Sequence, residues 1–263
     1  MFKLAIFGNP VEQSRSPELH QAFALQAQLS IDYQKITVSC DFAQAVRTFI
    51  DKGGHGFNIT SPCKFDAFQL ATKHSTRAKL AQAVNTLIVR PNGELWGDNT
   101  DGVGFVHDLT INKGFTVANK VIVIHGAGGA VRGLIPALFA QNPKQIWLIN
   151  RTLEKGLALA KEFLSLGVLQ AVPYGHILSD VDLLVDGSSF DCQQFAGLKS
   201  LQFTDSAWAY DLKYANAMTP FIQWAKARGI NNYTDGFGML VEQAAVSFFL
   251  WTGFSPETKR LLT

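Results

Sequence analysis

The stretch that decides the fold reads Val121-Ile122-Val123-Ile124-His125-Gly126-Ala127-Gly128-Gly129-Ala130. Its first four residues form a continuous apolar run, which is typical of a strand buried on both faces of a sheet. The glycines that follow let the backbone approach a pyrophosphate closely, and a helix over residues 131–140 would direct its free N–H groups at that anion. Val131 replaces the third glycine of the usual spacing, so a tight turn in an ordinary α/β layer is the alternative interpretation. The strand–turn–helix–strand order favours a dinucleotide site.

The next predicted strand, residues 145–149, indicates which dinucleotide would bind. A cofactor with an unmodified ribose needs Asp or Glu about 20 residues after the glycines. This strand ends instead in Asn150-Arg151-Thr152. The Arg151 guanidinium can pair with a ribose 2′-phosphate, and Thr152 can cap the next helix so that Lys155 faces the same phosphate. The pattern predicts NADP as the cofactor and not NAD.

Composition and charge exclude several classes of protein. The chain has 263 residues, of which 47% are hydrophobic, so it can bury one large core or two modest ones and is neither disordered nor a small disulfide-stabilised fold. The 23 basic and 21 acidic residues give a net charge of +2 with no basic run, which predicts no nucleic-acid partner and no binding to anionic membranes. We therefore expect a small-molecule substrate as the partner.

The cysteines and the N-terminus predict where the protein resides. Cys40, Cys63 and Cys192 are odd in number and have no C-x-x-C spacing, which favours reduced thiols over disulfides or a zinc site. The apolar start of the chain, residues 1–7, is too short for a signal peptide, and no apolar run reaches the ~18 residues that span a bilayer. We expect a cytoplasmic protein.

Two serines follow the first predicted strand, residues 4–7. Ser16 precedes Pro17, a pattern that predicts Ser16 as the N-cap of an amphipathic helix extending to about residue 29. Ser14 and Ser16 would then place two hydroxyls beside a helix N-terminus, which suits a carboxylate ligand. A serine that serves only as a cap is the alternative. A strand over residues 32–38 and a helix over 42–52 continue an alternating α/β pattern.

A lysine and two aspartates follow later predicted strands. Lys64 comes after the strand at residues 56–60, and functional groups of α/β sheets gather at such strand ends, although a solvated lysine is the simpler explanation. Asn85 lies in a strand at residues 83–89, and Asp98 and Asp101 lie in a polar stretch after the hairpin at 91–93. No His or Glu accompanies the two aspartates at a useful spacing, so we predict no metal site.

The remainder of the chain predicts more α/β structure. A helix runs from Thr152 to about residue 166, strands cover 182–185 and 207–212, and a helix begins at Thr219-Pro220 and ends at Gly229. A last helix over residues 238–251 is apolar over much of its surface and carries Gln243. Taken alone, a glutamine that caps backbone inside a buried helix is the simpler interpretation of Gln243.

Seven short motifs together make this sequence resemble the shikimate dehydrogenase family over nearly its whole length. In chain order they are Phe7-Gly8-Asn9-Pro10 with Ser14-x-Ser16-Pro17, Asn58-Ile59-Thr60-x-Pro62-x-Lys64, Ala83-Val84-Asn85-Thr86, Gly97-Asp98-Asn99-Thr100-Asp101-Gly102, Gly126-Ala127-Gly128-Gly129-Ala130, Asn150-Arg151-Thr152, and Asp235-Gly236-x-Gly238-Met239-Leu240-Val241-x-Gln243-Ala244.

The resemblance implies an α/β fold with two domains. Residues 1–101 together with 237–263 would form an N-terminal α/β substrate domain, and residues 102–236 a Rossmann-type NADP domain, with the substrate in the cleft between them. The implied reaction is oxidation of the ring hydroxyl of shikimate to the ketone, with hydride passing to NADP. The oxygen must lose a proton in the same event, so a proton-accepting group has to touch it. By the resemblance that group is the pair Lys64 and Asp101.

The remaining site residues are implied in the same way. Those expected to bind substrate are Ser14, Ser16, Thr60, Asn85, Tyr214 and Gln243. Those expected to bind the cofactor are Gly126, Ala127, Gly128, Gly129, Ala130, Asn150, Arg151, Thr152, Lys155 and Gly236. Side chains that hydrogen-bond the substrate hydroxyls reject analogues that lack them.

Three segments depart from the family pattern. Glu12-Gln13 stands where the family usually has Gly-His, Ser61-Pro62-Cys63 stands for Val-Pro-Phe, and residues 186–191 stand for Asn-Ala-Thr-Ser-x-Gly. A carboxylate at Glu12 near the substrate carboxylate predicts weak activity on shikimate, about 2 kcal/mol of repulsion at an effective dielectric near 20. The alternatives are a quinate or aminoshikimate dehydrogenase, and an NADP-binding sensor or partner-binding protein with little turnover. We expect a monomer or a homodimer.

Overall fold

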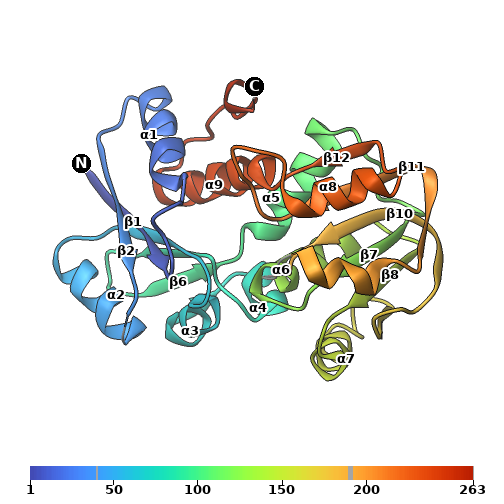
Figure 1. Cartoon of the computed structure of the whole chain (residues 1–263). Helices are drawn as coiled ribbons and strands as arrows, with labels where there is room; N and C mark the ends of the chain where they lie inside the picture. The colour runs from blue at the N-terminus through green and yellow to red at the C-terminus, as the bar shows by residue number, and fades with distance from the viewer. Residues whose placement is uncertain (40, 189–191, 263) are drawn as a thin grey trace. The chain divides into compact units, whose positions relative to one another are not determined.

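The computed structural model describes residues 1–39, 41–188 and 192–262 (Figure 1). Two compact units form: the first consists of Met1–His107 and Leu240–Thr263, and the second of Asp108–Met239. Cys40 and the 189–191 part of the altered loop lie outside the described residues. Within those described ranges, no helix combines the length and hydropathy that a membrane span requires.

The first unit is built on a mixed sheet, which has six strands in its described residues in the order β2-β1-β3-β5-β6-β4. β1 pairs in parallel with β2 and β3, whereas β5 pairs antiparallel with β3 and β6. Its elements are β1 (Phe2–Gly8), α1 (Ser16–Gln26), β2 (Ile31–Thr37), α2 (Phe42–Asp51), β3 (Gly56–Ile59), α3 (Lys64–Leu70), β4 (Lys73–His74), α4 (Thr76–Ala81), β5 (Thr86–Val89), β6 (Leu95–Asp98), α5 (Asp101–His107), most of α9 (Phe237–Thr252) and a 3-10 turn (Lys259–Leu261).

Side chains that alternate along these strands give the sheet two different faces. On one face, Phe7 and Phe57 make ring contacts with Phe49 of α2. On the other face, α1 and α9 meet, and the rings of Phe23 and Phe248 lie 5.7 Å apart. This second face also carries buried polar residues, and it is the one on which the candidate site is built.

The second unit contains a parallel sheet, whose described strands follow the order β12-β11-β10-β7-β8-β9. Its central strand β7 is the apolar run with which the sequence analysis began. The elements are a π-helical turn (Asp108–Asn112), β7 (Val121–His125), α6 (Gly129–Phe139), β8 (Gln145–Ile149), α7 (Leu153–Glu162), β9 (Leu169–Val172), β10 (Leu178–Asp186), a 3-10 helix (Cys192–Leu198), β11 (Leu201–Asp211), α8 (Pro220–Ala227) and β12 (Asn232–Thr234).

The predicted α/β fold class is confirmed, and two capping predictions are wrong. α1 begins at Ser16 itself with Arg15 at the N-cap, and the Ser16 backbone N–H donates to the Ser14 hydroxyl at 3.3 Å. Thr152 does occupy the N-cap position of α7, but its side chain makes no capping hydrogen bond. Thr219, in contrast, caps α8 by accepting from the Ile222 N–H.

Candidate active site

The first unit brings Lys64 and Asp101 together as an ion pair. Lys64 is the first residue of α3 and Asp101 the first residue of α5. The Lys64 Nζ and Asp101 Oδ2 atoms are 2.5 Å apart, and the two side chains are 12% and 7% exposed. Lys64 is therefore not a solvated surface lysine. Such a nearly buried ion pair can hold a proton and exchange it with a ligand.

Asn85, the residue that precedes β5, fixes the orientation of this pair. Its Nδ2 donates to Asp101 Oδ1 at 2.8 Å, and its Oδ1 accepts from the Thr100 backbone N–H at 2.8 Å. Gln243 of α9 joins the cluster, because its Oε1 lies 3.2 Å from Asn85 Nδ2. The Gln243 amide nitrogen also donates to the Leu240 carbonyl, so the backbone-capping interpretation holds for that end of the side chain.

The loop before Asp101 is held by a second ion pair that the sequence analysis did not single out. Arg77 of α4 makes a two-pronged contact with Asp98, with Nε–Oδ1 and Nη2–Oδ2 distances of 3.1 and 2.6 Å. Asn99 then donates to the Ala83 carbonyl and accepts from the Asp101 N–H. Asp98 thus serves the loop conformation, and planar bidentate geometry is what makes an arginine suited to that role.

The other three predicted substrate residues of the first unit follow β1 and β3 in the chain. Ser14 donates to the Ser16 hydroxyl at 3.1 Å, and Ser16 is 1% exposed. Thr60 follows β3, and its N–H donates to the Phe7 carbonyl. The turn of residues 61–63 then leads directly to Lys64, so one short segment connects Thr60 to the ion pair.

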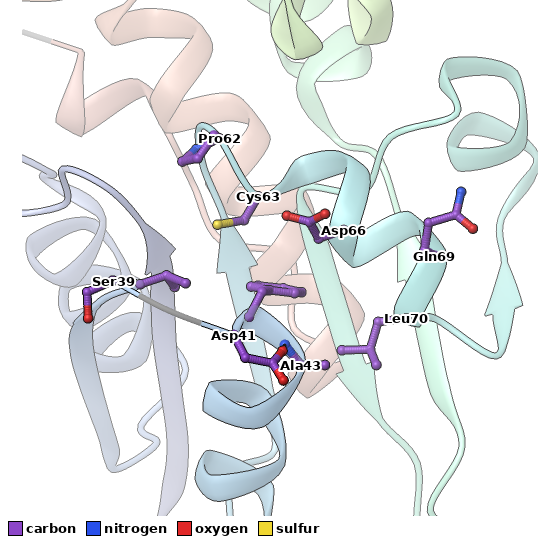
Figure 2. A pocket seen from close by; sticks show the side chains of 10 residues that line it. Ser39, Asp41, Ala43, Pro62, Cys63, Asp66, Gln69 and Leu70 are labelled. Atoms are coloured by element: carbon purple, nitrogen blue, oxygen red, sulfur yellow. The ribbon is translucent and has the colours of Figure 1, made fainter.

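A separate open hollow of about 590 Å³ lies beside α3 (Figure 2). Its walls come from the start of α2, the turn before α3 and α3 itself, and they include Asp41, Cys63 and Asp66. None of the predicted site residues lines it. Burial, with a contribution from Asp66, raises the pKa of the Cys63 thiol. The thiol next to Lys64 in the chain therefore stays protonated and is a poor nucleophile.

The glycine turn of the second unit has the geometry that an anion site needs. Gly126 has φ of +110°, and a Cβ there would lie 2.8 Å from the Gly187 carbonyl. Gly128 is the N-cap of α6, and a Cβ there would meet nothing within 4 Å. The turn is thus closely packed at Gly126 and open at Gly128, where the N-terminus of α6 presents its free N–H groups. Ala127, Gly129 and Ala130 complete the predicted segment.

Basic residues follow β8, where the sequence predicts a phosphate contact. Arg151 and Lys155 are both exposed, and Asn150 donates to the Thr152 carbonyl at 2.7 Å, which closes the turn between β8 and α7. Exposed cations at the end of a strand adjacent to β7 can pair with an anion held near the glycine turn. The residues present therefore fit a dinucleotide with an additional phosphate.

Tyr214 and Gly236 belong to the second unit. The other predicted substrate residues belong to the first unit. The Tyr214 ring lies 6.3 Å from that of Phe237. A Cβ on Gly236 would lie 2.3 Å from the Leu212 carbonyl oxygen, and the Gly236 N–H donates to the Lys213 carbonyl. Gly236 is thus required for the close approach of two backbone segments beside the C-terminal end of β11.

Comparisons with known proteins agree with this geometry. Three family models match: the shikimate dehydrogenase substrate binding domain over residues 6–87, shikimate / quinate 5-dehydrogenase over residues 110–190, and the shikimate 5′-dehydrogenase C-terminal domain over residues 236–261. A shikimate dehydrogenase (NADP(+)) from Alkalilimnicola ehrlichii is 42% identical over 97% of this chain and 95% of that protein. The chain belongs to the shikimate dehydrogenase family.

Two further members of the shikimate dehydrogenase family support the assignment. A shikimate dehydrogenase (NADP(+)) from Vesicomyosocius okutanii is 40% identical over 100% of this chain and 98% of that protein. The crystal structure of shikimate 5-dehydrogenase from Thermus thermophilus, in complex with NADP(H) and shikimate, has a TM-score of 0.83 and 30% identity, and covers 98% of this chain and 96% of that one.

One cluster in the second unit was not predicted from the sequence. Asp186, which replaces the asparagine typical of the shikimate dehydrogenase family, ends β10 opposite His125 of β7. The buried His125 donates through Nδ1 to Asp186 Oδ1 at 2.8 Å, and its Nε2 lies 2.8 Å from the Tyr174 hydroxyl. Burial would raise the pKa of Asp186, but the hydrogen bond from His125 and the charge of Lys213 lower it. The substitution is thus compensated by two basic neighbours.

Proposed function

We propose that this protein is an NADP-dependent shikimate dehydrogenase, which oxidises the ring hydroxyl of shikimate to the ketone, and that Lys64 and Asp101 manage the proton. The observation that carries the proposal is the nearly buried contact of 2.5 Å between Lys64 Nζ and Asp101 Oδ2. A protein that only binds its ligand has no need of a proton-exchanging pair at that position.

The pair would act on the proton that the ring hydroxyl loses. As the C–H electron pair leaves as hydride, the O–H bond breaks and its proton passes to the Lys64–Asp101 pair, which leaves a carbonyl group. Asn85 holds Asp101 Oδ1 at 2.8 Å, so Oδ2 stays directed at Lys64. In the reverse direction the same pair would return the proton to the oxygen.

The remaining polar residues would select the substrate. We propose that Ser14, Ser16, Thr60 and Tyr214 bind its carboxylate, and that Asn85, Asp101 and Gln243 bind its hydroxyls. Asn85 and Gln243 are 2% and 7% exposed, so a ligand that left their amides unpaired would incur the desolvation cost of buried polar groups. This cost is the physical basis for choosing a polyhydroxylated ring.

NADP would bind on the second unit and accept the hydride. The glycine turn and the α6 N-terminus would hold the pyrophosphate, with Arg151 and Lys155 on the 2′-phosphate. In domain terms, we propose that residues 1–101 with 237–263 bind the substrate and that residues 102–236 bind NADP. We further propose a cytoplasmic monomer or homodimer that binds no nucleic acid.

The surroundings of Glu12 reduce the repulsion on which the expectation of poor shikimate turnover was based. The Glu12 carboxylate is exposed and accepts from the Thr37 hydroxyl at 2.8 Å and from the Val11 N–H at 3.0 Å, while Lys35 donates to the Glu12 carbonyl. In solvent the effective dielectric approaches 80, so a repulsion of about 2 kcal/mol falls to roughly 0.5 kcal/mol. Shikimate therefore remains the substrate that we expect, ahead of quinate or aminoshikimate.

A steady-state assay tests the proposal. Purified protein would be offered NADP with shikimate, quinate and aminoshikimate separately, and NADPH formation followed by absorbance. We expect the highest kcat/KM with shikimate. A preference for quinate or aminoshikimate would change the substrate, and NADP binding without turnover of any of the three would favour the sensor alternative.

A further inference from the structure

Ser247 lies in α9 one helical turn after Gln243, and its side chain is fully buried. Its Oγ atom is 2.7 Å from Thr86 Oγ1, 3.1 Å from Asn58 Nδ2 and 3.3 Å from Thr100 Oγ1. The same oxygen is 3.1 Å from the backbone carbonyl oxygen of Gln243, to which it can donate. One hydroxyl of α9 thus reaches β3, β5 and the loop before α5.

Two of these partners stand next to residues of the candidate site. Thr86 follows Asn85 in the chain, and its Oγ1 lies 3.0 Å from Asn85 Oδ1. Thr100 precedes Asp101, and its Oγ1 lies 2.9 Å from Asn85 Nδ2. The Ser247 hydroxyl therefore anchors α9 to the two segments that carry Asn85 and Asp101.

Hydrogen bonds in both directions hold the Ser247 hydroxyl. Asn58 Nδ2 also lies 3.3 Å from the backbone carbonyl oxygen of Asn85, which can only accept, so this side of the Asn58 amide is its nitrogen. Ser247 Oγ therefore accepts from Asn58 at 3.1 Å. Its own proton goes either to the Gln243 carbonyl or to Thr86, and both arrangements keep the side chain in one rotamer.

The Gln243 side chain has one orientation in this structure, and it is easily disturbed. Its Nε2 donates to the Leu240 carbonyl at 3.0 Å, so Oε1 is the atom that accepts from Asn85 and Thr100, both at 3.2 Å. These two distances are at the upper limit for a hydrogen bond, so a shift of α9 by a few tenths of an ångström weakens both contacts. The amide nitrogen carries a second hydrogen, which a substrate hydroxyl can accept.

We propose that Ser247 is a positioning residue for substrate binding: by anchoring α9 to the sheet, it holds the Gln243 amide in its orientation before a ring hydroxyl of the substrate arrives. This proposal rests on the proposed function, in which Gln243 binds such a hydroxyl. An amide that is already oriented loses less rotational freedom on binding, so the affinity for the substrate is higher. The 2.8 Å bond from Asn85 to Asp101 does not pass through Ser247, so the proton-exchanging pair keeps its geometry without it.

The variant Ser247→Ala removes the anchoring oxygen. We expect the KM for shikimate to rise about three- to tenfold, with kcat changed less than about threefold and the KM for NADP unchanged. A purely structural role would lower the fraction of folded enzyme and thus the apparent kcat, and would leave the KM for shikimate unchanged. A KM that changes by less than about twofold in Ser247→Ala would overturn the proposal.

Thr252→Val is the matched control in the same helix. The Thr252 hydroxyl donates to the carbonyl of Phe248, four residues earlier, which is the bond that Ser247 makes to Gln243. We expect the control to leave the KM for shikimate unchanged. An equal rise in Thr252→Val would mean that any lost hydroxyl in α9 disturbs the site, and would contradict a specific role of Ser247.

The variant Ser247→Cys separates hydrogen bonding from packing, because a thiol fills the space of the hydroxyl but hydrogen-bonds only weakly. It also serves as the test if Ser247→Ala does not fold. We expect its KM for shikimate to rise as in Ser247→Ala. A wild-type KM in Ser247→Cys would mean that the filled volume, and not the hydrogen bonds, supports the site, and the proposal would be wrong.

A double-mutant cycle with Gln243→Ala tests the route of the effect. If Ser247 acts through Gln243, the KM of the double variant should lie within about twofold of that of Gln243→Ala alone. Multiplication of the two single effects would show that Ser247 acts by another route and would refute the proposal. Wild-type protein without shikimate turnover would instead refute the proposed function and the Ser247 proposal with it, so the two failures can be told apart.

Discussion

A Cβ atom added at Gly104 of α5 would lie 2.5 Å from the backbone nitrogen of Gln243 in α9. The two helices therefore approach each other so closely that only hydrogen fits between them at this point. Because Gln243 contacts Asn85 and Asp101 begins α5, this approach sets the spacing of two predicted site residues.

Gly104→Ala should therefore damage both stability and substrate binding. We expect the free energy of unfolding to fall by about 1–3 kcal/mol, as for other overpacked cores, and the KM for shikimate to rise because α9 must shift. Urea denaturation and steady-state kinetics measure the two effects. Val103→Ala, at the adjacent and partly exposed position, should leave the KM unchanged; if Gly104→Ala does so too, the close approach does not determine the site.

The Lys64–Asp101 pair predicts a loss of catalysis without a loss of cofactor. Lys64→Met and Asp101→Asn should each lower kcat by about 10²–10⁴, because each removes a proton-exchanging group while retaining most of the volume. The Kd for NADP, measured by fluorescence titration, should stay within about twofold. Lys79→Ala removes an exposed lysine of α4 as the charge control. A normal kcat in Lys64→Met would exclude lysine from the proton transfer.

Arg151 predicts the choice between the two nicotinamide cofactors. Arg151→Ala should weaken NADP binding about 10- to 100-fold, since a charge-assisted hydrogen bond contributes roughly 1.5–3 kcal/mol, and should leave NAD binding unchanged. Titration of both cofactors against the wild type and the variant gives the two ratios. Lys144→Ala removes an equal charge from another exposed position. Equal losses for NADP and NAD in Arg151→Ala would contradict the assignment.

His20 predicts sensitivity of the fold to acid. Burial, opposed by the hydrogen bond to Asn58, lowers the pKa of His20 to about 3 from an ordinary value of 6.5. Below pH 6.5 the unfolded chain therefore binds a proton that the folded protein excludes, and the free energy of unfolding falls by up to ~1.4 kcal/mol per pH unit until about pH 3.

The variant His20→Phe tests this dependence, because phenylalanine keeps a ring beside Tyr33 and cannot be protonated. Urea denaturation at pH 7 and pH 5 should show that the wild type loses about 2 kcal/mol more than the variant between these two conditions. The variant should be less stable at pH 7, since Asn58 loses a donor. The same loss in both proteins would mean that other groups cause the acid sensitivity.

Glu12 predicts a small effect where the sequence alone suggested a large one. Glu12→Gln should lower the KM for shikimate by no more than about threefold, because the exposed carboxylate is screened by solvent. The KM values of the two proteins should approach each other as the ionic strength is raised. If Glu12→Gln lowers the KM for shikimate tenfold or more, the effective dielectric between the Glu12 carboxylate and the substrate is lower than that of solvent.

The sequence predicted the elements that depend on local patterns. The apolar run at residues 121–124 and the glycines after it became β7 and the turn before α6, because strand and turn preferences there act over a few residues. Lys64 and Asp101 were paired by resemblance alone, and the structure now provides their contact. Nothing in the sequence distinguished Lys64 from a solvated lysine before its partner was known.

The residues that the sequence analysis missed depend on tertiary contacts. His20 reaches Asn58 across 38 residues of chain, and Tyr33 lies in a strand whose neighbours Gln34 and Lys35 are exposed. A tyrosine in such a strand reads as an ordinary strand former. Asp186 was recognised as a departure, but its partner His125 was not, because strand register is a property of the folded sheet.

The buried hydrogen-bond network that joins Asn58, Thr86 and Ser247 constrains how this protein can evolve. Each member both gives and takes a hydrogen bond, so a single replacement leaves two buried neighbours unpaired, and a second replacement nearby is needed to repair them. Asn58, Thr86 and Ser247 should therefore vary among relatives as a group and seldom one at a time. In a laboratory selection for a new substrate, these positions should change late, after the more exposed positions around Glu12 have been explored.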